Sequence, residues 1–155
     1  MQEIQPPNPL KVETKFSVFL AGSIEQGKAE DWQKKFVKKL DKYDITFLNP
    51  RRDDWDSSWG QTKEDENFVK QVTWELDALE KADLVIVYFD PNTKSPITIG
   101  ETYLYVKSGK LIVCCPEGFV RKGNIDVTCD YYKVPQANTL DELIELTKLK
   151  FLNDN

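Results

Sequence analysis

A glutamate that follows a buried strand is the residue of this chain best placed for chemistry. Glu101 ends the segment 95–101 (Ser-Pro-Ile-Thr-Ile-Gly-Glu), which comes after an apolar run and opens a predicted helix. Parallel α/β sheets place their ligands beyond the carboxyl ends of their strands, and the N–H groups of a helix start favour an ionised carboxylate. Two interpretations stay open. If Thr98 is the helix cap, Glu101 only satisfies a backbone donor in a capping box. If Ser95 is the cap and Pro96 lies in the first turn, Glu101 is available for other work.

The composition limits the chemistry that the chain can perform. The 155 residues include no histidine, which excludes Ser-His-Asp and Cys-His catalysis and leaves carboxylates as the expected proton-transfer and nucleophilic groups. Three cysteines without C-x-x-C spacing predict neither a disulfide framework nor a metal site, and they favour a reducing, cytoplasmic location. A net charge of -5 without a basic stripe argues against a nucleic-acid polymer or a membrane surface as partner. No apolar run approaches the length of a membrane span.

A second carboxylate lies on the helix predicted over residues 62–81. Glu75 lies beside the apolar face of this helix rather than opposite it, so its side chain can point into a cleft under the sheet edge. The alternative is that Glu75 pairs with Gln71 or Lys81 at the surface. The predicted apolar face consists of Phe68, Val72, Leu76 and Leu79.

Two loops that follow strands carry residues suited to binding a nucleotide. The loop that begins Asn49-Pro50-Arg51-Arg52 continues with three aspartates and two tryptophans, Trp55 and Trp59. Aromatic rings can stack on a base, and arginine can bind a phosphate or order the carboxylates. The alternative is a solvated loop with local ion pairs, and we favour a site wall because function concentrates in long loops after strands. Gly22 and Ser23 after the first strand let a ligand approach backbone N–H groups, although glycine there is more often only a turn.

The alternation of apolar strands with amphipathic helices predicts one α/β domain. We expect a flexible arm at residues 1–15, followed by a single domain at 16–155 that is a flavodoxin- or Rossmann-like three-layer sandwich with a mostly parallel, five-stranded sheet. The adjacent cysteines 114 and 115 should lie on opposite faces of their strand, and Trp32 should belong to the core. The expected strands are 16–21, 44–48, 84–89, 110–115 and 131–134, and the expected helices are 28–43, 62–81, 99–107 and 140–151.

With these residues in view, the chain resembles the nucleoside 2-deoxyribosyltransferase family, and in particular its divergent branch. The resemblance spans most of residues 16–130 and depends on the order and spacing of several short motifs rather than on any one of them. The motifs are Val18-Phe-Leu-Ala-Gly-Ser-Ile24, Asn49-Pro-Arg-Arg52, Trp74-Glu-Leu76, Ala82-Asp83, Pro96-Ile-Thr-Ile-Gly-Glu101 and Gly123-Asn124.

The resemblance implies a role for each matching residue. Glu101 takes the position of the family's nucleophile, and Glu75 that of the acidic residue that contacts the base. Asn124, expected in the loop after the fourth strand, matches an asparagine that reaches the sugar hydroxyl in a neighbouring subunit, which implies a homo-oligomer of two or more copies. Phe19 stands where many members have a tyrosine. Ser95 stands where the better-studied transferases have a base-binding aspartate, and Asp90 is a nearby substitute.

These residues and the resemblance together predict transfer of a 2-deoxyribosyl group between nucleobases through a covalent glycosyl-glutamate, without a cofactor or metal. The expected partners are a nucleoside or nucleotide and a free nucleobase. One alternative is an N-glycoside hydrolase of nucleosides or nucleoside 5′-monophosphates, for which Arg51, Arg52, Gly22 and Ser23 would suit the phosphate. A further alternative is a non-catalytic nucleotide-binding module.

Overall fold

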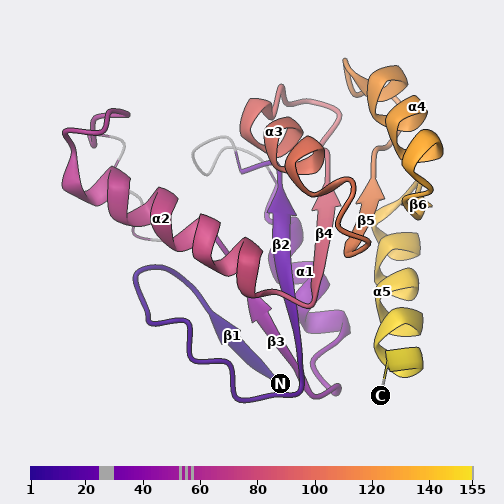
Figure 1. Cartoon of the computed structure of the whole chain (residues 1–155), viewed down its shortest axis with the longest axis horizontal. Helices are drawn as coiled ribbons and strands as arrows, with labels where there is room; N and C mark the ends of the chain where they lie inside the picture. Colours follow the sequence, from indigo (N-terminus) through magenta and orange to yellow (C-terminus); the bar gives the residue numbers. More distant parts are fainter. Residues whose placement is uncertain (25–29, 53, 55, 57, 155) are drawn as a thin grey trace.

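The protein forms one parallel six-stranded sheet surrounded by helices (Figure 1). The computed structural model describes residues 1–24, 30–52, 54, 56 and 58–154. The strands run in the order β1-β3-β2-β4-β5-β6, and every neighbouring pair is parallel. The strands are β1 (Gln2–Ile4), β2 (Phe16–Gly22), β3 (Ile45–Leu48), β4 (Leu84–Tyr88), β5 (Leu111–Cys114) and β6 (Gln136–Ala137).

The five strands from β2 onward have the flavodoxin order. Numbered along the chain without β1, they run 2-1-3-4-5, which is the arrangement of a doubly wound sheet. In such a sheet the chain changes winding direction between the first and third strands, here between β2 and β4, and ligands bind at the carboxyl ends there. The α/β class and parallel sheet are therefore confirmed, but the sheet has six strands rather than five.

The additional strand comes from the N-terminal segment, where we expected a flexible arm. Gln2–Ile4 pairs with β3 as an edge strand. The following residues cross α2 (Glu66–Lys81), where Trp74 Nε1 donates to the Asn8 carbonyl at 2.8 Å and Lys81 Nζ donates to the Leu10 carbonyl at 2.6 Å. The segment is therefore not the flexible arm that we expected, because its backbone groups form hydrogen bonds with β3 and α2.

The core has two parts, because alternate strand residues face opposite sides of the sheet. Phe19 and Cys115 belong to one cluster and Cys114 to the other, as expected for adjacent cysteines. One cluster includes residues of α2, α3 (Pro96–Tyr105) and α4 (Lys122–Tyr132), whereas the other includes residues of α1 (Trp32–Lys39) and α5 (Leu140–Asp154). Trp32 is 1% exposed and belongs to the second cluster, as predicted.

Two expected elements differ from the structure. The strand expected at 131–134 is instead the end of α4, which Lys133 terminates in the left-handed region at φ 57° before the chain continues into β6. On α2, Leu76 was expected to face the core but is 48% exposed, while the polar Gln71 is only 4% exposed. The inward face of α2 is therefore rotated from the predicted one, and Gln71 has replaced an apolar side chain there.

None of the described helices is both long and apolar enough to cross a membrane.

Candidate active site

Glu101 lies within α3 and does not cap it. The helix begins at Pro96 with Ser95 as the cap residue, held in the left-handed region at φ 43°. Thr98 is therefore already inside the first turn, and Glu101 lies in the second turn, beyond the positions where a carboxylate can close a capping box. Of the two interpretations left open by the sequence, the structure supports the one in which Glu101 is free for other work.

Glu75 on α2 and Glu101 on α3 form a pair of half-buried carboxyl groups. Burial, and to a smaller extent the negative charge of Glu75, raise the pKa of Glu101 to about 8. Burial also raises the pKa of Glu75, to about 6, although a hydrogen bond from Gln71 opposes this rise. Between these two values the ligand-free pair holds one proton, so one group is acidic while the other is ionised.

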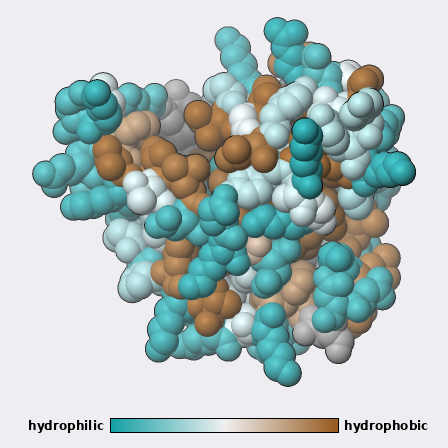
Figure 2. Space-filling model, in the orientation of Figure 1, coloured by the Kyte–Doolittle hydropathy of each residue, from teal (hydrophilic) through white to brown (hydrophobic). Residues whose placement is uncertain are grey.

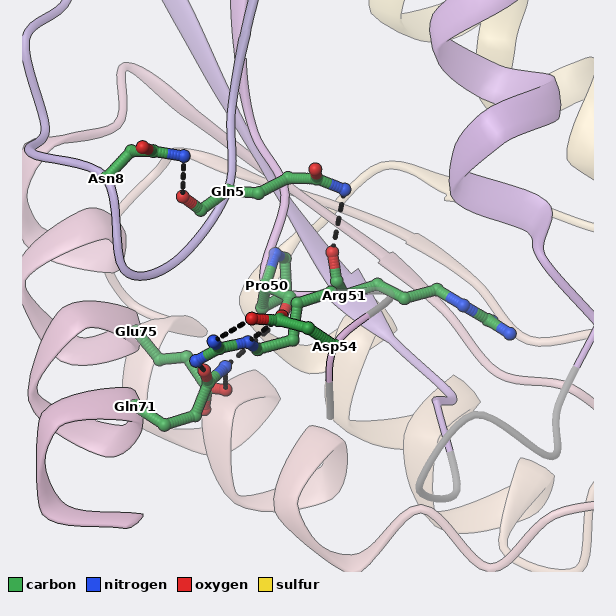
Figure 3. Close-up of polar contacts among 8 residues, drawn as sticks. Gln5, Asn8, Pro50, Arg51, Asp54, Gln71 and Glu75 are labelled. Carbon is green, nitrogen blue, oxygen red and sulfur yellow. Dashed lines mark hydrogen bonds and ion pairs between the residues drawn. The ribbon is translucent and has the colours of Figure 1, made fainter. Parts of the chain in front are cut away.

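The Gln71 side chain connects Glu75 to the loop after β3 (Figure 3). Its Nε2 donates to Glu75 Oε1 at 2.7 Å and to the Pro50 carbonyl at 3.1 Å. Its Oε1 accepts a hydrogen bond from Arg52 Nη1 at 3.4 Å. Glu75 does pair with Gln71, but this contact is part-buried rather than at the exposed surface that the alternative interpretation assumed.

The two arginines of this loop point to different partners. Arg52 makes a two-fold contact with Asp54, at 2.5 and 2.6 Å, and its guanidinium lies 5.0 Å from the centre of the Trp59 ring. This hydrogen bonding to Asp54 raises the pKa of Arg52. Arg51 extends away from Glu75 in Figure 3, and its Nη1 donates to the Glu30 carbonyl at 3.1 Å. Arg52 is therefore joined to Glu75 through Gln71.

The Asn49 side chain holds two segments of the backbone together. It is 4% exposed, its Nδ2 donates to Glu3 Oε1 at 2.8 Å, and its Oδ1 accepts from the Arg51 N–H at 3.0 Å. The side chain thus joins β1 to the start of the loop and shapes the backbone that precedes the arginines. Trp55 lies outside the described residues.

A cluster of hydroxyl groups lies where β2 and β4 end, at the point where the sheet changes winding direction. Ser23 Oγ is 2.6 Å from Ser95 Oγ and 2.9 Å from Thr93 Oγ1. The Asp90 N–H donates to Ser23 Oγ at 2.9 Å, and the Asp90 carboxylate accepts from the N–H and side chain of Asn92. Asp90 therefore closes a local turn, and the hydroxyl groups connect the end of β2 to the start of α3.

Gly22 is required by close packing beside this hydroxyl cluster. A Cβ atom there would lie 2.6 Å from both the Tyr88 carbonyl oxygen and the Trp32 ring. The Ser23 N–H donates to the same carbonyl at 3.0 Å, which joins the end of β2 to β4. Gly22 therefore lets the two strands approach closely enough for Ser23 to reach Ser95.

Asn124 belongs to another helix than the carboxyl pair. It is exposed in the first turn of α4 rather than in a loop, and no side-chain hydrogen bond joins it to another described residue. The sequence analysis missed Thr93 and the position of Gln71 at the centre of the network. The i, i+4 spacing of Gln71 and Glu75 was the available signal, because residues four apart on a helix are neighbours.

Two cavities lined by described residues lie elsewhere in the fold. One of about 370 Å³ is lined by the segments that follow α3 and α4, and one of about 200 Å³ by α4 and β6. Glu75 and Glu101 line neither of these two cavities. Among the described residues, no group of three or more His, Cys, Asp or Glu side chains is arranged to hold a metal ion.

Comparison with known proteins gives a family and a fold. The family model described as nucleoside 2-deoxyribosyltransferase like matches residues 15–119. A crystal structure of a conserved protein from Enterococcus faecalis V583 superimposes with a TM-score of 0.62 at 13% identity, covering 87% of this chain and 98% of that one. At this identity the likeness shows the fold alone. No curated protein matches this sequence.

Proposed function

Since this chain belongs to the nucleoside 2-deoxyribosyltransferase-like family, we propose that it transfers a 2-deoxyribosyl group between nucleobases through a covalent bond to Glu101. The observation that carries the proposal is the pair of half-buried carboxyl groups on α2 and α3, whose pKa values differ. Two carboxyl groups whose environments separate their pKa values are the usual means by which one site supplies both an acid and a nucleophile.

The first half-reaction breaks the bond between the sugar and its base. A carboxylate oxygen of Glu101 attacks the anomeric carbon, and the bond from that carbon to the base nitrogen breaks, with its electron pair moving to the base. Glu75 donates a proton to the departing base. The glycosyl-glutamate then waits for an acceptor.

The second half-reaction reverses these events with a different base. A nitrogen of the incoming base attacks the anomeric carbon, the carbon–oxygen bond to Glu101 breaks, and the base loses its proton to Glu75. Every step is a displacement at one carbon or a proton transfer, and the two carboxyl groups supply both. In the free pair the shared proton lies on Glu101, whose pKa is the higher, so it must transfer to Glu75 before Glu101 attacks. The positive charge that develops on the sugar favours this transfer by stabilising ionised Glu101.

The surrounding residues would bind the remainder of the substrate. Arg52 and Trp59 form a packed wall beside Glu75, with Arg51, Trp55 and Asn49 in the same loop. Asn124, exposed on α4, would act in a second copy of the chain, so we propose a homo-oligomer.

The hydroxyl cluster favours a second candidate, hydrolysis of nucleoside 5′-monophosphates. Ser23, Thr93 and Ser95 offer neutral donors at the carboxyl ends of β2 and β4, and Ser95 replaces the carboxylate that base-binding transferases carry. Ser95 adds no negative charge that would repel a phosphate, and the Asp90 carboxylate in this cluster is hydrogen-bonded to Asn92. In this reaction water takes the place of the acceptor base.

A panel of nucleosides and nucleotides tests the proposal. Each 2-deoxynucleoside and its 5′-monophosphate is incubated with purified protein, with and without a free acceptor base, beside the Glu101→Gln variant. A new nucleoside formed only with the acceptor supports transfer, whereas free base released equally without it supports hydrolysis. Absence of turnover with every substrate, or turnover unaffected by the substitution, would contradict both and favour a non-catalytic nucleotide-binding module.

A further inference from the structure

We propose that Gln71 is a positioning residue that holds Glu75 in one orientation with one defined oxygen free to carry its proton, and that Arg52 fixes the direction of the Gln71 amide. This inference rests on the proposed function for its meaning, because Glu75 is there the proton donor. It extends that function to two residues that do not touch the reacting atoms.

The amide of Gln71 can adopt only one of its two flipped orientations. A guanidinium has donors and no acceptor, so the atom that faces Arg52 Nη1 at 3.4 Å must be the amide oxygen. A backbone carbonyl only accepts, so the atom that faces Pro50 O at 3.1 Å must be the amide nitrogen. Both neighbours therefore require the same orientation, which places the second N–H of Nε2 toward Glu75.

The surroundings make this orientation rigid. Gln71 is 4% exposed, so reversing its amide would leave buried polar groups facing each other without a hydrogen bond. Arg52 is itself held by Asp54 and by the Trp59 ring, and its side chain is 11% exposed. The chain of contacts thus runs from the loop after β3, through α2, to the carboxyl pair.

The hydrogen bond from Gln71 makes the two carboxyl oxygens of Glu75 different from each other. Oε1 accepts the Gln71 N–H at 2.7 Å, so a proton on this carboxyl group lies on Oε2. The same hydrogen bond favours ionised Glu75 and opposes the rise of its pKa by burial. Among the described residues, the charged groups that face Glu75 are Glu101 on α3 and, through Gln71, Arg52 with its partner Asp54.

The chain contains a matched control for the test. Gln33 on α1 is another buried glutamine, 0% exposed, and neither of its amide atoms has a hydrogen-bond partner in the described structure. Replacement of either glutamine by methionine keeps the length and approximate volume of the side chain and removes the amide. Gln33→Met should therefore leave the carboxyl pair unchanged and keep or raise the melting temperature, because it removes an unsatisfied buried group.

The test is an NMR titration of the glutamate side-chain carbons in the ligand-free protein. We expect Gln71→Met to raise the apparent pKa of Glu75 by about one unit, since a hydrogen bond to the charged form is lost. Gln33→Met should give the wild-type value. Arg52→Met, which frees the Gln71 amide to turn, should also raise the apparent pKa of Glu75, but by less than Gln71→Met does. If Gln71→Met does not fold, Arg52→Met alone tests the positioning role.

The pH profile of turnover gives a second measurement. The acidic limb of kcat/KM should move upward in Gln71→Met by the same amount as the titration. A wild-type pKa for Glu75 in both Gln71→Met and Arg52→Met would overturn the positioning role, even if turnover fell. Absence of turnover in the wild type would instead contradict the proposed function, while the titration would still decide whether Gln71 sets the state of Glu75.

Discussion

At the scale of single residues, Glu101 is placed where its charge is unfavourable. Folding raises its pKa from an ordinary 4.5 to about 8, so its contribution to stability is complete below the ordinary value and is lost as the pH rises through the folded one. Residues placed for function often reduce stability in this way.

The Glu101→Gln substitution should therefore stabilise the protein in a pH-dependent manner. We expect its free energy of unfolding at about pH 8.5 to exceed that of the wild type by roughly 1–3 kcal/mol, since one pKa unit corresponds to about 1.4 kcal/mol and partial solvation reduces the total. Denaturant titrations at about pH 5 and 8.5 measure this difference. Glu64→Gln in an exposed loop is the control. A difference that does not grow with pH would show that the Glu101 environment is not as described.

The same pair predicts the pH dependence of turnover. Below about pH 6 both carboxyl groups hold protons and the nucleophile lacks its charge, whereas above about pH 8 both are ionised and the acid is missing. We therefore expect kcat/KM to pass through a maximum between these values, with both limbs belonging to the pair. A profile that keeps rising past pH 8 would contradict a shared proton.

At the scale of elements, Lys110 is the residue that secures the end of α2, the helix of Gln71 and Glu75. Its Nζ donates to the carbonyls of Leu79, Glu80 and Ala82 at 2.7, 3.2 and 3.1 Å. These groups include the last carbonyls of the helix, which have no partner within it and carry the negative end of its dipole.

Removal of this cap should lower stability. We expect Lys110→Met to reduce the free energy of unfolding by about 2 kcal/mol, because three carbonyls, two of them in part-buried contacts, lose charge-assisted hydrogen bonds. Lys107→Met, at an exposed site near the Tyr132 ring, should change it by less than about 0.5 kcal/mol. Guanidinium unfolding curves measure both, and equal effects would contradict the capping role.

The parts of the fold that could be predicted are those with strong periodicity. The buried strands β2 to β5 appear as apolar runs. The change from the apolar run that contains Val18 and Phe19 to the helical spacing that begins at Trp32 marks a crossover from strand to helix. Strand β1 could not be predicted, because three residues carry no period and gain their pairing only from β3. The inward face of α2 was misassigned because the polar Gln71 lies inside the protein, held by partners distant in sequence.

The positions of some candidate site residues could be predicted from the sequence, and those of others could not. The two carboxyl groups follow from their positions on helices beside β4, and the structure brings them together. The different directions of Arg51 and Arg52, and the use of Asn49 to bind Glu3, depend on tertiary contacts with no local signal.

At the scale of the whole molecule, hydrophobic residues gather over α2 and α3 (Figure 2). Exposed large apolar side chains on these helices include Val69, Leu76, Ile97 and Leu104, the last at 64% exposure. A gathering of exposed apolar side chains is typical of a protein interface. It lies on α2 and α3, the helices that carry the carboxyl pair, and we expect a second copy of the chain to pack there.

Light scattering coupled to size exclusion tests this assembly. We expect the wild type to elute as a dimer or larger oligomer and Leu104→Lys to dissociate it, because a charge would be buried without a partner. Leu149→Lys, at a 53% exposed position on α5, should leave the assembly intact. A monomeric wild type at assay concentration would contradict the expected oligomer.

The covalent intermediate is the most direct test of the central claim. The protein is incubated with a 2-deoxynucleoside without acceptor, quenched with acid, and examined by intact-mass spectrometry and peptide mapping. The account predicts a mass increase of one deoxyribosyl group on the peptide that contains Glu101, its absence in Glu101→Gln, and its loss on addition of a free base with formation of a new nucleoside. Substrate turnover without this adduct in rapidly quenched samples, or an adduct that persists in Glu101→Gln, would contradict it.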